Sequence, residues 1–317
     1  MYLDVTGVTG FIKGSYSMGY GTPQASIDVE CVGFSGSLND VITMDLGSVG
    51  SHAVIFTGRV KEITEKRSRA GWNYNIRAYD ELILAADFFI AADDPDIPLS
   101  VYNIASEDLV EDLLNLASIT SYSSTSPGLT LATSGSYRID RVFAIDMINK
   151  VATMAGYHVW TSADGTVNFK QLLPYPVGAP SHALTVGNTG ELVELARGVS
   201  EESLRNRIVA YGAAGLKSVA SAVSPYLPAG FYKTAIIGHP IMDTQAAVDK
   251  CSSVNLTIMN RLSESVQCGL VGDHTILFGQ TITVTEVKTG TSGDWFVSNI
   301  SHSISSSGFI TQLSLTK

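Results

Sequence analysis

Apolar and polar residues alternate along much of the first 95 residues, with the period of two that is typical of half-buried β-strands. The alternation is clearest in residues 24–33, 53–64 and 72–80. A polar turn ending at Gly71 joins the second segment to the third, which predicts a β-hairpin. Residues 81–89 predict a short helix or an irregular exit from these strands. We therefore expect residues 1–95 to form a small β-barrel domain.

Residues 96–181 show helical spacing instead. Ser106 is followed by two acidic residues and predicts the hydroxyl cap of a helix with Leu109, Leu113 and Leu116 on one stripe. A second helix is predicted to begin near Asp140 and to end at Gly156. Residues 157–170 then predict two strands joined by an Asp-Gly turn. This middle part is expected to be a small α+β module.

β character returns in residues 182–317. A third helix is expected near 244–263, with Asp243 as its cap and a stripe formed by Ala247, Cys251, Val254, Ile258 and Leu262. Residues 213–240 form an insertion whose structure the pattern does not define, either an arm between subunits or a loop that becomes ordered on assembly. Residues 281–315 alternate again and predict a run of strands.

The first and last thirds of the chain share a pattern of strand, polar glycine-containing loop and strand. Each third also has a tryptophan in a predicted strand, Trp72 in the first and Trp295 in the last. Antiparallel β-proteins often resemble one another at this level. A duplicated barrel fold is therefore one of two open interpretations, and chance similarity is the other.

Composition adds a surface of low charge to this picture. Charged residues make up 16% of the chain, against about 25% in an ordinary soluble domain. Such a surface suits a protein that packs against copies of itself. The net charge of −10 argues against a protein that grips nucleic acid, because phosphate neutralisation needs clustered Lys and Arg. It is compatible with DNA sliding past an acidic wall.

The three cysteines, Cys31, Cys251 and Cys268, include no C-x-x-C spacing, which argues against disulfides and cysteine-based zinc sites. Residues 1–14 lack the basic start and apolar run of a signal peptide. The longest apolar stretch, residues 82–92, is interrupted by Asp87 and is too short to span a bilayer. We expect a chain of a reducing compartment with no membrane-spanning segment.

Two groups of residues are candidate metal sites. Asp273 and His274 lie in a turn upstream of Asp294 and His302, but without ligand spacing, which favours solvated turn and strand residues over a metal site. The run Asp93, Asp94 and Asp96 resembles part of a calcium loop. It lacks the glycine and the terminal glutamate of such loops, and prolines interrupt it, so a charged linker is favoured.

Catalytic motifs are absent or incomplete. Residues 33–36 read Gly-Phe-Ser-Gly, which has the wrong spacing for a nucleophile elbow, and the Gly-Tyr-Gly at 19–21 lacks the third glycine of a dinucleotide site. Glu201 and Glu202 are adjacent in sequence, and adjacency alone does not indicate that their carboxylates face a common substrate. We predict no catalytic, cofactor-binding or metal-binding residues and no cofactor, although an active site built from distant residues would leave no such pattern.

One charge feature stands out, the basic cluster formed by Lys61, Lys66, Arg67 and Arg69. It is interpreted as a solvated hairpin tip, with contact to an acidic surface of a neighbouring subunit as the alternative. The three tryptophans lie in predicted strands and are expected in the core, which argues against a carbohydrate-binding groove; they are Trp72, Trp160 and Trp295.

The order of these segments resembles the baseplate or tail-tip hub proteins of tailed phages and contractile injection systems. The resemblance rests on these phrases: FTGRVKEI (56–63), RAYDEL (77–82), AIDMINKVA (144–152), DGTVNF (164–169), RNRIVAYG (205–212), GQTITV (279–284), WFVSNISHSI (295–304) and GFITQLSL (308–315). They follow the family's order over most of the chain, though each phrase alone is unspecific. No lysozyme-like or peptidase domain of the kind found in some family members accompanies them.

The resemblance implies a mainly-β fold with α+β insertions: two tail-tube-like β-barrel domains, 1–95 and 182–317, separated by the α+β module at 96–181. It also implies a structural, non-enzymatic hub that forms a homotrimer. Three copies would present six similar barrels as a pseudo-sixfold ring between a tail tube protein above and a spike protein below, in contact with other baseplate proteins. DNA would pass through the lumen without specific binding. The resemblance places the protein in the virion tail, assembled in the host cytoplasm.

Two other functions stay open. One is a tail-associated cell-wall hydrolase or another enzyme on a β scaffold. The other is a receptor-binding or carbohydrate-binding tail protein.

Overall fold

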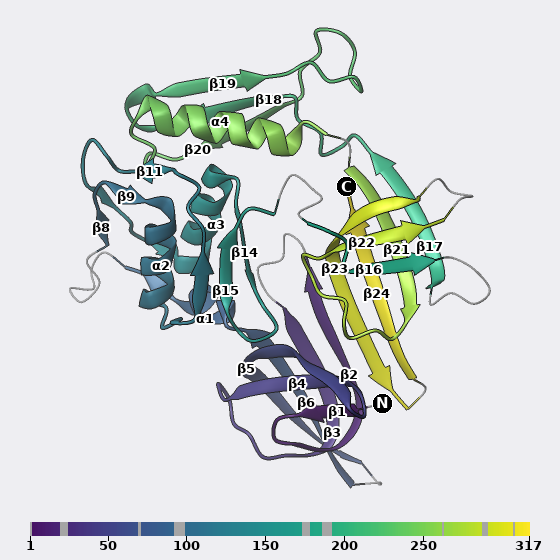
Figure 1. Cartoon of the computed structure of the whole chain (residues 1–317). Helices are drawn as coiled ribbons and strands as arrows, with labels where there is room; N and C mark the ends of the chain where they lie inside the picture. Colours follow the sequence, from purple (N-terminus) through teal and green to yellow (C-terminus); the bar gives the residue numbers. More distant parts are fainter. Residues whose placement is uncertain are drawn as a thin grey trace.

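The computed structural model describes residues 2–19, 25–68, 71–91, 99–172, 178–185, 192–261, 263–286, 291–306 and 308–317. Most elements are strands, and the described residues include four α-helices. The predicted mainly-β class with α+β insertions is confirmed. Figure 1 shows two groups of strands, one at each end of the chain, and a helical part beside them.

Twelve strands form one large sheet, and the first six of them belong to the first 80 residues. These are β1 Tyr2–Val5, β2 Val8–Gly19, β3 Ser26–Phe34, β4 Val41–Ser48, β5 Ser51–Ser68 and β6 Gly71–Asp80. Their spatial order is β1-β4-β5-β6-β3-β2, and every neighbouring pair is antiparallel.

The last six strands of the sheet repeat this order. They are β16 His182–Thr185, β17 Leu192–Ser200, β21 Ser263–Val271, β22 Thr281–Thr285, β23 Gly293–Ser305 and β24 Gly308–Thr316. Their spatial order is β16-β22-β23-β24-β21-β17. When the six strands of each half are numbered by their order along the chain, the spatial order in both halves is first, fourth, fifth, sixth, third, second. We call β1–β6 the N-terminal half and the other six strands the C-terminal half.

The hydrogen-bond register repeats as well, down to the irregularities. The β5–β6 and β23–β24 hairpins each skip one residue, Lys61 and Ser298, at the same distance from their turns. The β2–β3 and β17–β21 ladders each skip one residue in matching places, Ile12 and Val193. A bulge displaces every later side chain by one position, so shared bulges are specific marks. The structure thus confirms the duplication.

Two details depart from the expected repeat. β1 pairs antiparallel with β4, whereas β16 pairs parallel with β22. The two tryptophans that suggested the repeat are not equivalent, because the hairpin register matches Trp72 with Phe309. Trp295 lies on the other strand of its hairpin and is buried, as predicted.

The expected burial of the other tryptophans was wrong for Trp72 and partly right for Trp160. Trp72 is 50% exposed because it lies beside the open tip of the β5–β6 hairpin, where the guanidinium of Arg67 stacks 5.6 Å from its ring. Trp160 is half-buried and packs 6.3 Å from the ring of Phe278.

The two halves are joined edge to edge by β2 and β23. Their ladder runs from Gly14 opposite Ile304 to Gly19 opposite Asn299. A single hydrophobic core extends across the joint and contains buried side chains from both halves, among them Val29, Ile76 and Leu313. The predicted β domains at the two ends of the chain are therefore continuous with each other.

A second core lies in the helical part. Its helices are α1 Leu82–Asp87, α2 Ser106–Leu116, α3 Ala144–Ala155 and α4 Gln245–Met259. Its short strands are β7 Phe89–Ile90, β8 Ser100–Val101, β9 Ile104–Ala105, β10 Tyr122–Ser124, β11 Thr130–Leu131, β12 Tyr137–Arg138, β13 Val142–Phe143, β14 His158–Thr161 and β15 Val167–Lys170. The predicted hairpin of residues 157–170 is β14–β15, and the predicted exit helix is α1.

The 213–240 insertion forms part of a separate three-stranded sheet. Its strands are β18 Arg207–Tyr211, β19 Lys217–Ser221 and β20 Thr234–Gly238, in the order β19-β18-β20, with the 3-10 turn η1 Ala213–Gly215 between β18 and β19. Ala210, Met242 and Val248 are buried in the same core as α2 and α3. This portion of the predicted 182–317 segment therefore packs with the middle part of the chain rather than with the large sheet.

Two of the predicted helix caps and one predicted helix start were wrong. The Ser106 hydroxyl does not cap α2; it is buried and donates to the Glu107 carboxylate at 3.3 Å. The second helix begins at Ala144 rather than near Asp140, because Val142 and Phe143 are held extended by pairing with β7. Its predicted end is confirmed, since Gly156 takes the left-handed conformation with φ 68°.

Asp243 is likewise not the cap of α4. The Thr244 hydroxyl accepts from the N–H of Ala247 at 3.3 Å and caps the helix. The Asp243 carboxylate instead accepts hydrogen bonds from Thr133 and Ser134, 110 and 109 residues away. Partial burial raises the pKa of Asp243, but these bonds outweigh it and lower the pKa to about 2. Of the predicted α4 stripe, Ala247 and Cys251 are buried, Val254 and Ile258 are half-buried, and Leu262 lies outside the described residues.

The shared core makes a testable prediction. Ile76→Ala and Leu313→Ala truncate equivalent, fully buried side chains in the two halves. Each should lower the free energy of unfolding by about 2–5 kcal/mol and move a single common transition in urea, because one core spans both halves. Ile310→Ala, at a position 52% exposed, is the matched control and should have little effect. Two separate transitions, each shifted by only one variant, would contradict a shared core.

Candidate functional site: the free edges of the sheet

The joint between the halves is built around two stacked rings. Tyr16 on β2 lies opposite His302 on β23, with ring centroids 5.5 Å apart, and both side chains are buried. The His302 Nδ1 atom lies 3.0 Å from the Thr311 hydroxyl. Burial lowers the pKa of His302 to about 4, so the imidazole is neutral at physiological pH. The paired segments of the joint therefore carry no formal charge.

Duplication gives the sheet two more edges of the same kind. In the repeat, β17 of the C-terminal half corresponds to β2 of the N-terminal half. The second half of β5 corresponds to the segment of β23 with which β2 pairs at the joint. Over the described ranges, β17 pairs only with β21, and residues 62–68 of β5 pair only with β6. Unpaired strand edges carry open N–H and C=O groups that readily take another strand.

The exposure of apolar side chains marks these edges as incomplete. Met18 is 6% exposed at the joint, whereas Val199, its counterpart on β17, is 54% exposed. Ile300 is buried at the joint, whereas its counterpart Ile63 on β5 is only half-buried. Positions covered at the joint are thus uncovered at both free edges.

The two free edges are complementary when they are paired in the register of the joint. Leu195–Ser200 then runs antiparallel to residues 62–67, as Gly14–Gly19 does to residues 299–304. Val199 comes opposite Ile63, and Arg197 comes opposite Glu65. Opposite charges and apolar pairs at directly facing positions stabilise a ladder. Arg197, which within the chain pairs with Glu264 of β21 at 3.0 Å, and Glu65 would then hold the positions of the stacked Tyr16 and His302.

The candidate metal residues are placed apart. His302 and Asp273 are linked through Thr311, whose hydroxyl accepts from the Asp273 N–H at 2.9 Å. Asp294 accepts from the Thr283 hydroxyl at 2.6 Å, and His274 lies in the turn after β21. Among the residues that the structure describes, no group of three His, Cys, Asp or Glu could hold a metal ion. Asp93, Asp94 and Asp96 lie outside the described residues.

The residues of the basic cluster have different surroundings along the β5–β6 hairpin. Lys61 pairs with Asp87 at 2.7 Å and ties the sheet to α1, while Lys66 is exposed near the end of β5. Arg69 lies outside the described residues. Glu201, the first of the two adjoining glutamates, pairs with Lys233 at 3.1 Å.

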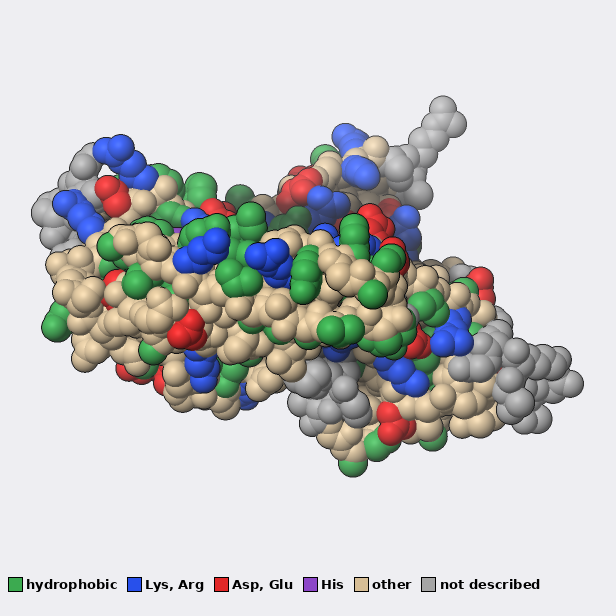
Figure 2. Space-filling model, turned by 90° about the horizontal axis from the view of Figure 1, so that it is seen from above, with side chains coloured by type: hydrophobic (Ala, Val, Ile, Leu, Met, Phe, Trp, Pro, Cys, Tyr) green, Lys and Arg blue, Asp and Glu red, His purple; other side chains and the backbone are tan. Residues whose placement is uncertain are grey.

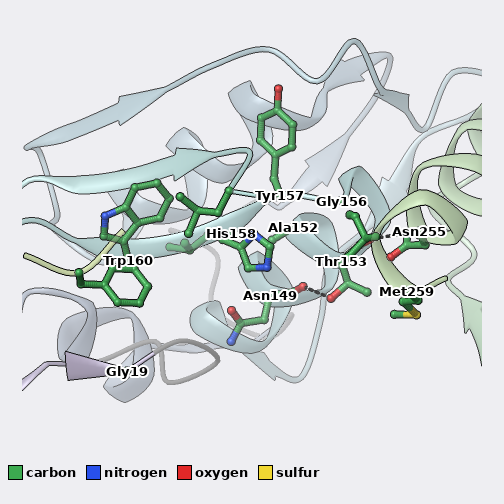
Figure 3. A pocket seen from close by; sticks show the side chains of 14 residues that line it. Gly19, Asn149, Ala152, Thr153, Gly156, Tyr157, His158, Trp160, Asn255 and Met259 are labelled. Carbon is green, nitrogen blue, oxygen red and sulfur yellow. Dashed lines mark hydrogen bonds between the residues drawn. The ribbon is translucent and has the colours of Figure 1, made fainter. Parts of the chain in front are cut away.

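A cavity of about 290 Å³ lies between β14, α3 and α4 (Figure 3). For the residues that the structure describes, its lining includes Tyr157, Trp160, Phe278 and one histidine, His158, and no Asp, Glu or Cys. Burial and the nearby charge of Arg261 lower the pKa of His158 to about 4. The cavity therefore offers an apolar wall and an uncharged imidazole, without a carboxylate or thiol for catalysis.

The three cysteines are buried and free, and burial raises the pKa of Cys251 and Cys268 to about 12. No helix in the described part of the chain is both long and apolar enough to cross a membrane.

Solved structures show where this architecture occurs. A tail protein from Neisseria meningitidis superposes with a TM-score of 0.72 at 14% identity, covering 99% of this chain and 96% of that one. A 43 kDa tail protein of prophage MuSo2 from Shewanella oneidensis gives a TM-score of 0.69 at 12% identity, with the same coverage, 99% and 96%. This chain has the fold of phage tail proteins. The resemblance read from the sequence is thereby confirmed at the level of fold.

A type VI secretion system component from E. coli shares this tail-protein fold, with a TM-score of 0.61 at 10% identity over 99% of this chain and 76% of its own. It is described as structurally similar to the T4 bacteriophage tail proteins gp27 and gp5. No protein-family model and no curated protein matches the sequence itself. The likeness is therefore carried by structure alone.

Sequence reasoning missed the residues of the joint and of the free edges. A signal for them exists in the two hairpins: Val60, Ile63, Ser68 and Gly71 recur with the same spacing in residues 297–308. Aligning the halves on that spacing matches β17 with β2 and exposes the unpaired edges.

A buried carboxyl anchors the helical part to the sheet. Asp80 is 1% exposed at the end of β6 and accepts hydrogen bonds from the N–H groups of Ala25 and Leu82, the latter at 3.0 Å. Burial raises the pKa of Asp80 to about 7, although these hydrogen bonds act to lower it.

This carboxyl predicts a pH dependence of stability. The folded pKa lies above the unfolded value, so the folded state holds a proton that the unfolded chain releases above about pH 4. The contribution of Asp80 to the free energy of unfolding should therefore fall between about pH 4 and pH 7, while the lowered pKa of His158 and of His302 makes their contributions rise with pH below about 6.5. Asp80→Asn removes only the falling contribution, so its free energy of unfolding should rise more steeply with pH than that of the wild type up to about pH 7. Asp108→Asn, on an exposed helix face, should keep the wild-type slope. Urea titrations between pH 5 and 8.5 measure it; an unchanged slope in Asp80→Asn would contradict the assignment.

Proposed function

We propose that the protein is a structural, non-enzymatic hub of a phage tail baseplate or tail tip, and that it works as a homotrimer. The observation that carries the proposal is the duplicated sheet with one internal joint and two complementary free edges. The shared fold of known tail proteins supports the proposed location in a phage tail.

In the proposed trimer, β17 of each copy pairs with β5 of the next. Each copy contributes the eight strands from β5 to β17 in the order of the sheet. Three copies then close a ring of six similar halves in which internal joints alternate with joints between subunits. A head-to-tail contact of this kind closes into a ring when its rotation allows. All strand edges at these joints are satisfied.

A ring with six similar halves and true threefold symmetry can meet two kinds of partner. We propose a sixfold tail tube on one side and a threefold spike on the other, with other baseplate proteins around them, in a virion assembled in the host cytoplasm. Three copies carry a charge of about −30, three times −10. Such a ring would let DNA pass through its lumen without binding it specifically.

The first test is the mass of the protein in solution by light scattering across a range of concentrations. The proposal predicts a species of about 101 kDa, three times 33.7 kDa. A closed dimer at every concentration would overturn it, because a twofold assembly cannot alternate the two kinds of joint around a ring.

A charge exchange tests the register. Arg197→Glu and Glu65→Arg each place like charges opposite one another, which costs about 1 kcal/mol per joint. Three joints should raise the concentration at which trimers dissociate about tenfold. Arg197 also pairs with Glu264 of its own chain at 3.0 Å, so the exchange is made in a Glu264→Gln background. In that background the double variant places Glu at 197 opposite Arg at 65 and should recover the trimer.

The matched control for the exchange is Lys250→Glu, on the exposed side of α4. It makes the same change in net charge as Arg197→Glu and should leave the trimer unchanged. Equal weakening by both single variants without recovery in the double variant would show that these residues do not face each other.

A further inference from the structure

Charge is segregated along the chain. Residues 78–137 contain ten Asp and Glu and no Lys or Arg. Residues 203–242 contain four Lys and Arg and no Asp or Glu. A chain with a net charge of −10 therefore contains a long segment that is basic and free of acidic residues.

The basic segment folds as the β18–β20 sheet, which has one covered and one open face. α4 packs on the covered face, where Ser218 on β19 bonds Ser252 at 2.9 Å. The open face carries apolar side chains from all three strands: Tyr211 is 40% exposed, Val219 44% and Ile236 70%. Figure 2 shows hydrophobic and Lys or Arg side chains next to one another on the surface seen from above, where this sheet lies.

Aromatic rings and cations gather at the end of this sheet that connects to β17. Phe231 and Tyr232 are each about half exposed, and the Arg207 guanidinium lies 5.5 Å from the Tyr232 ring. The buried side chain of Asn206 holds this end in place through the Phe231 carbonyl and the Lys233 N–H. We call Arg207, Phe231, Tyr232 and Lys233 the cationic-aromatic patch.

The opposite charge is concentrated on α2. Glu107, Asp108, Glu111 and Asp112 occupy two successive turns. Partial burial, followed by the neighbouring charges of Asp108 and Glu111, raises the pKa of Asp112. Within the residues that the structure describes, no ion pair joins this acidic face to a Lys or Arg. The repulsion along α2 would be relieved by a cationic surface from outside the chain.

The topology brings these two surfaces to the same side of the proposed subunit joint. Residues 201–206 connect β17 directly to the patch. The next copy would pair its β5 with that same β17, and its β5–β6 hairpin leads through α1 into the part that holds α2. The patch of one copy and α2 of the next copy are thus each connected by a short stretch of chain to the same joint.

We propose that the cationic-aromatic patch of one copy docks on the acidic face of α2 of the next copy in the ring. This inference rests on the proposed trimer and adds a second contact to each subunit joint. Cations beside exposed rings favour an acidic protein surface, and α2 of a second copy supplies one. The contact would join the β18–β20 sheet of one copy to α2 of the next, in addition to the pairing of β17 with β5.

The test uses a mixture of unlabelled and ¹⁵N-labelled full-length protein, reassembled together and treated with a carbodiimide that joins Lys to carboxylates at zero length. The expected result is a mixed-isotope link between Lys233 and residues 107–112. The link from Lys233 to Glu201, 3.1 Å apart in one chain, should carry a single isotope and serves as the internal control.

Variants make the test selective. Arg207→Glu should reduce the mixed link about tenfold while the trimer mass is retained, and Asp112→Lys should do the same from the other side. Lys150→Glu, exposed on α3, is the matched control and should leave the link unchanged.

The outcomes separate the two proposals. A trimer whose Lys233 forms only same-isotope links, or links to another acidic segment, overturns the docking and leaves the ring standing. A protein that stays monomeric and forms no mixed link overturns both. A mixed link that survives Arg207→Glu and Asp112→Lys at full strength would also reject the patch as its cause.

Discussion

The pairing of β2 with β23 is the interaction on which the rest of the structure depends. A strand edge in water invites another strand, and here the chain satisfies one such edge internally by joining its two halves. Duplication then leaves the same edge unsatisfied twice more, on β17 and on β5. In the proposed trimer the internal joint is therefore the template for the contact between subunits, and its register specifies which residues should meet there.

In the proposed trimer, the internal joint and the joint between subunits would pair strands in the same register with different side chains. The internal joint is made once, during folding, and carries a buried neutral imidazole stacked on a tyrosine. A joint between subunits has to keep its strands soluble until they meet. Arg197, which pairs with Glu264 of β21 at 3.0 Å within the chain, and Glu65 place polar, charged side chains on the two edges beforehand, and the proposed pairing brings them opposite each other. This difference also disfavours pairing of β17 with β23, where Arg197 would face a buried ring.

Much of the fold could be predicted from the sequence, because alternation, turn glycines and helical stripes are local signals. The β5–β6 hairpin, the Gly156 stop and the β14–β15 hairpin all followed from such patterns. The cap predicted at Ser106 and the helix start predicted near Asp140 were wrong because strands paired with distant segments, β9 and β13, run directly into these helices. The candidate interface was invisible for a similar reason. It depends on which strand lies beside which, and only the register of long-range ladders shows that β17 lacks the partner that β2 has.

The central claim is that free edges of neighbouring copies pair in the register of the internal joint. Electron cryo-microscopy of the purified assembly, at a resolution that separates strands, tests it most directly. The account predicts a threefold ring of six similar halves, with β17 of one copy antiparallel to β5 of the next and Arg197 opposite Glu65. An assembly in which β17 or the second half of β5 is exposed to solvent, or in which the copies are related by a twofold axis, would contradict it.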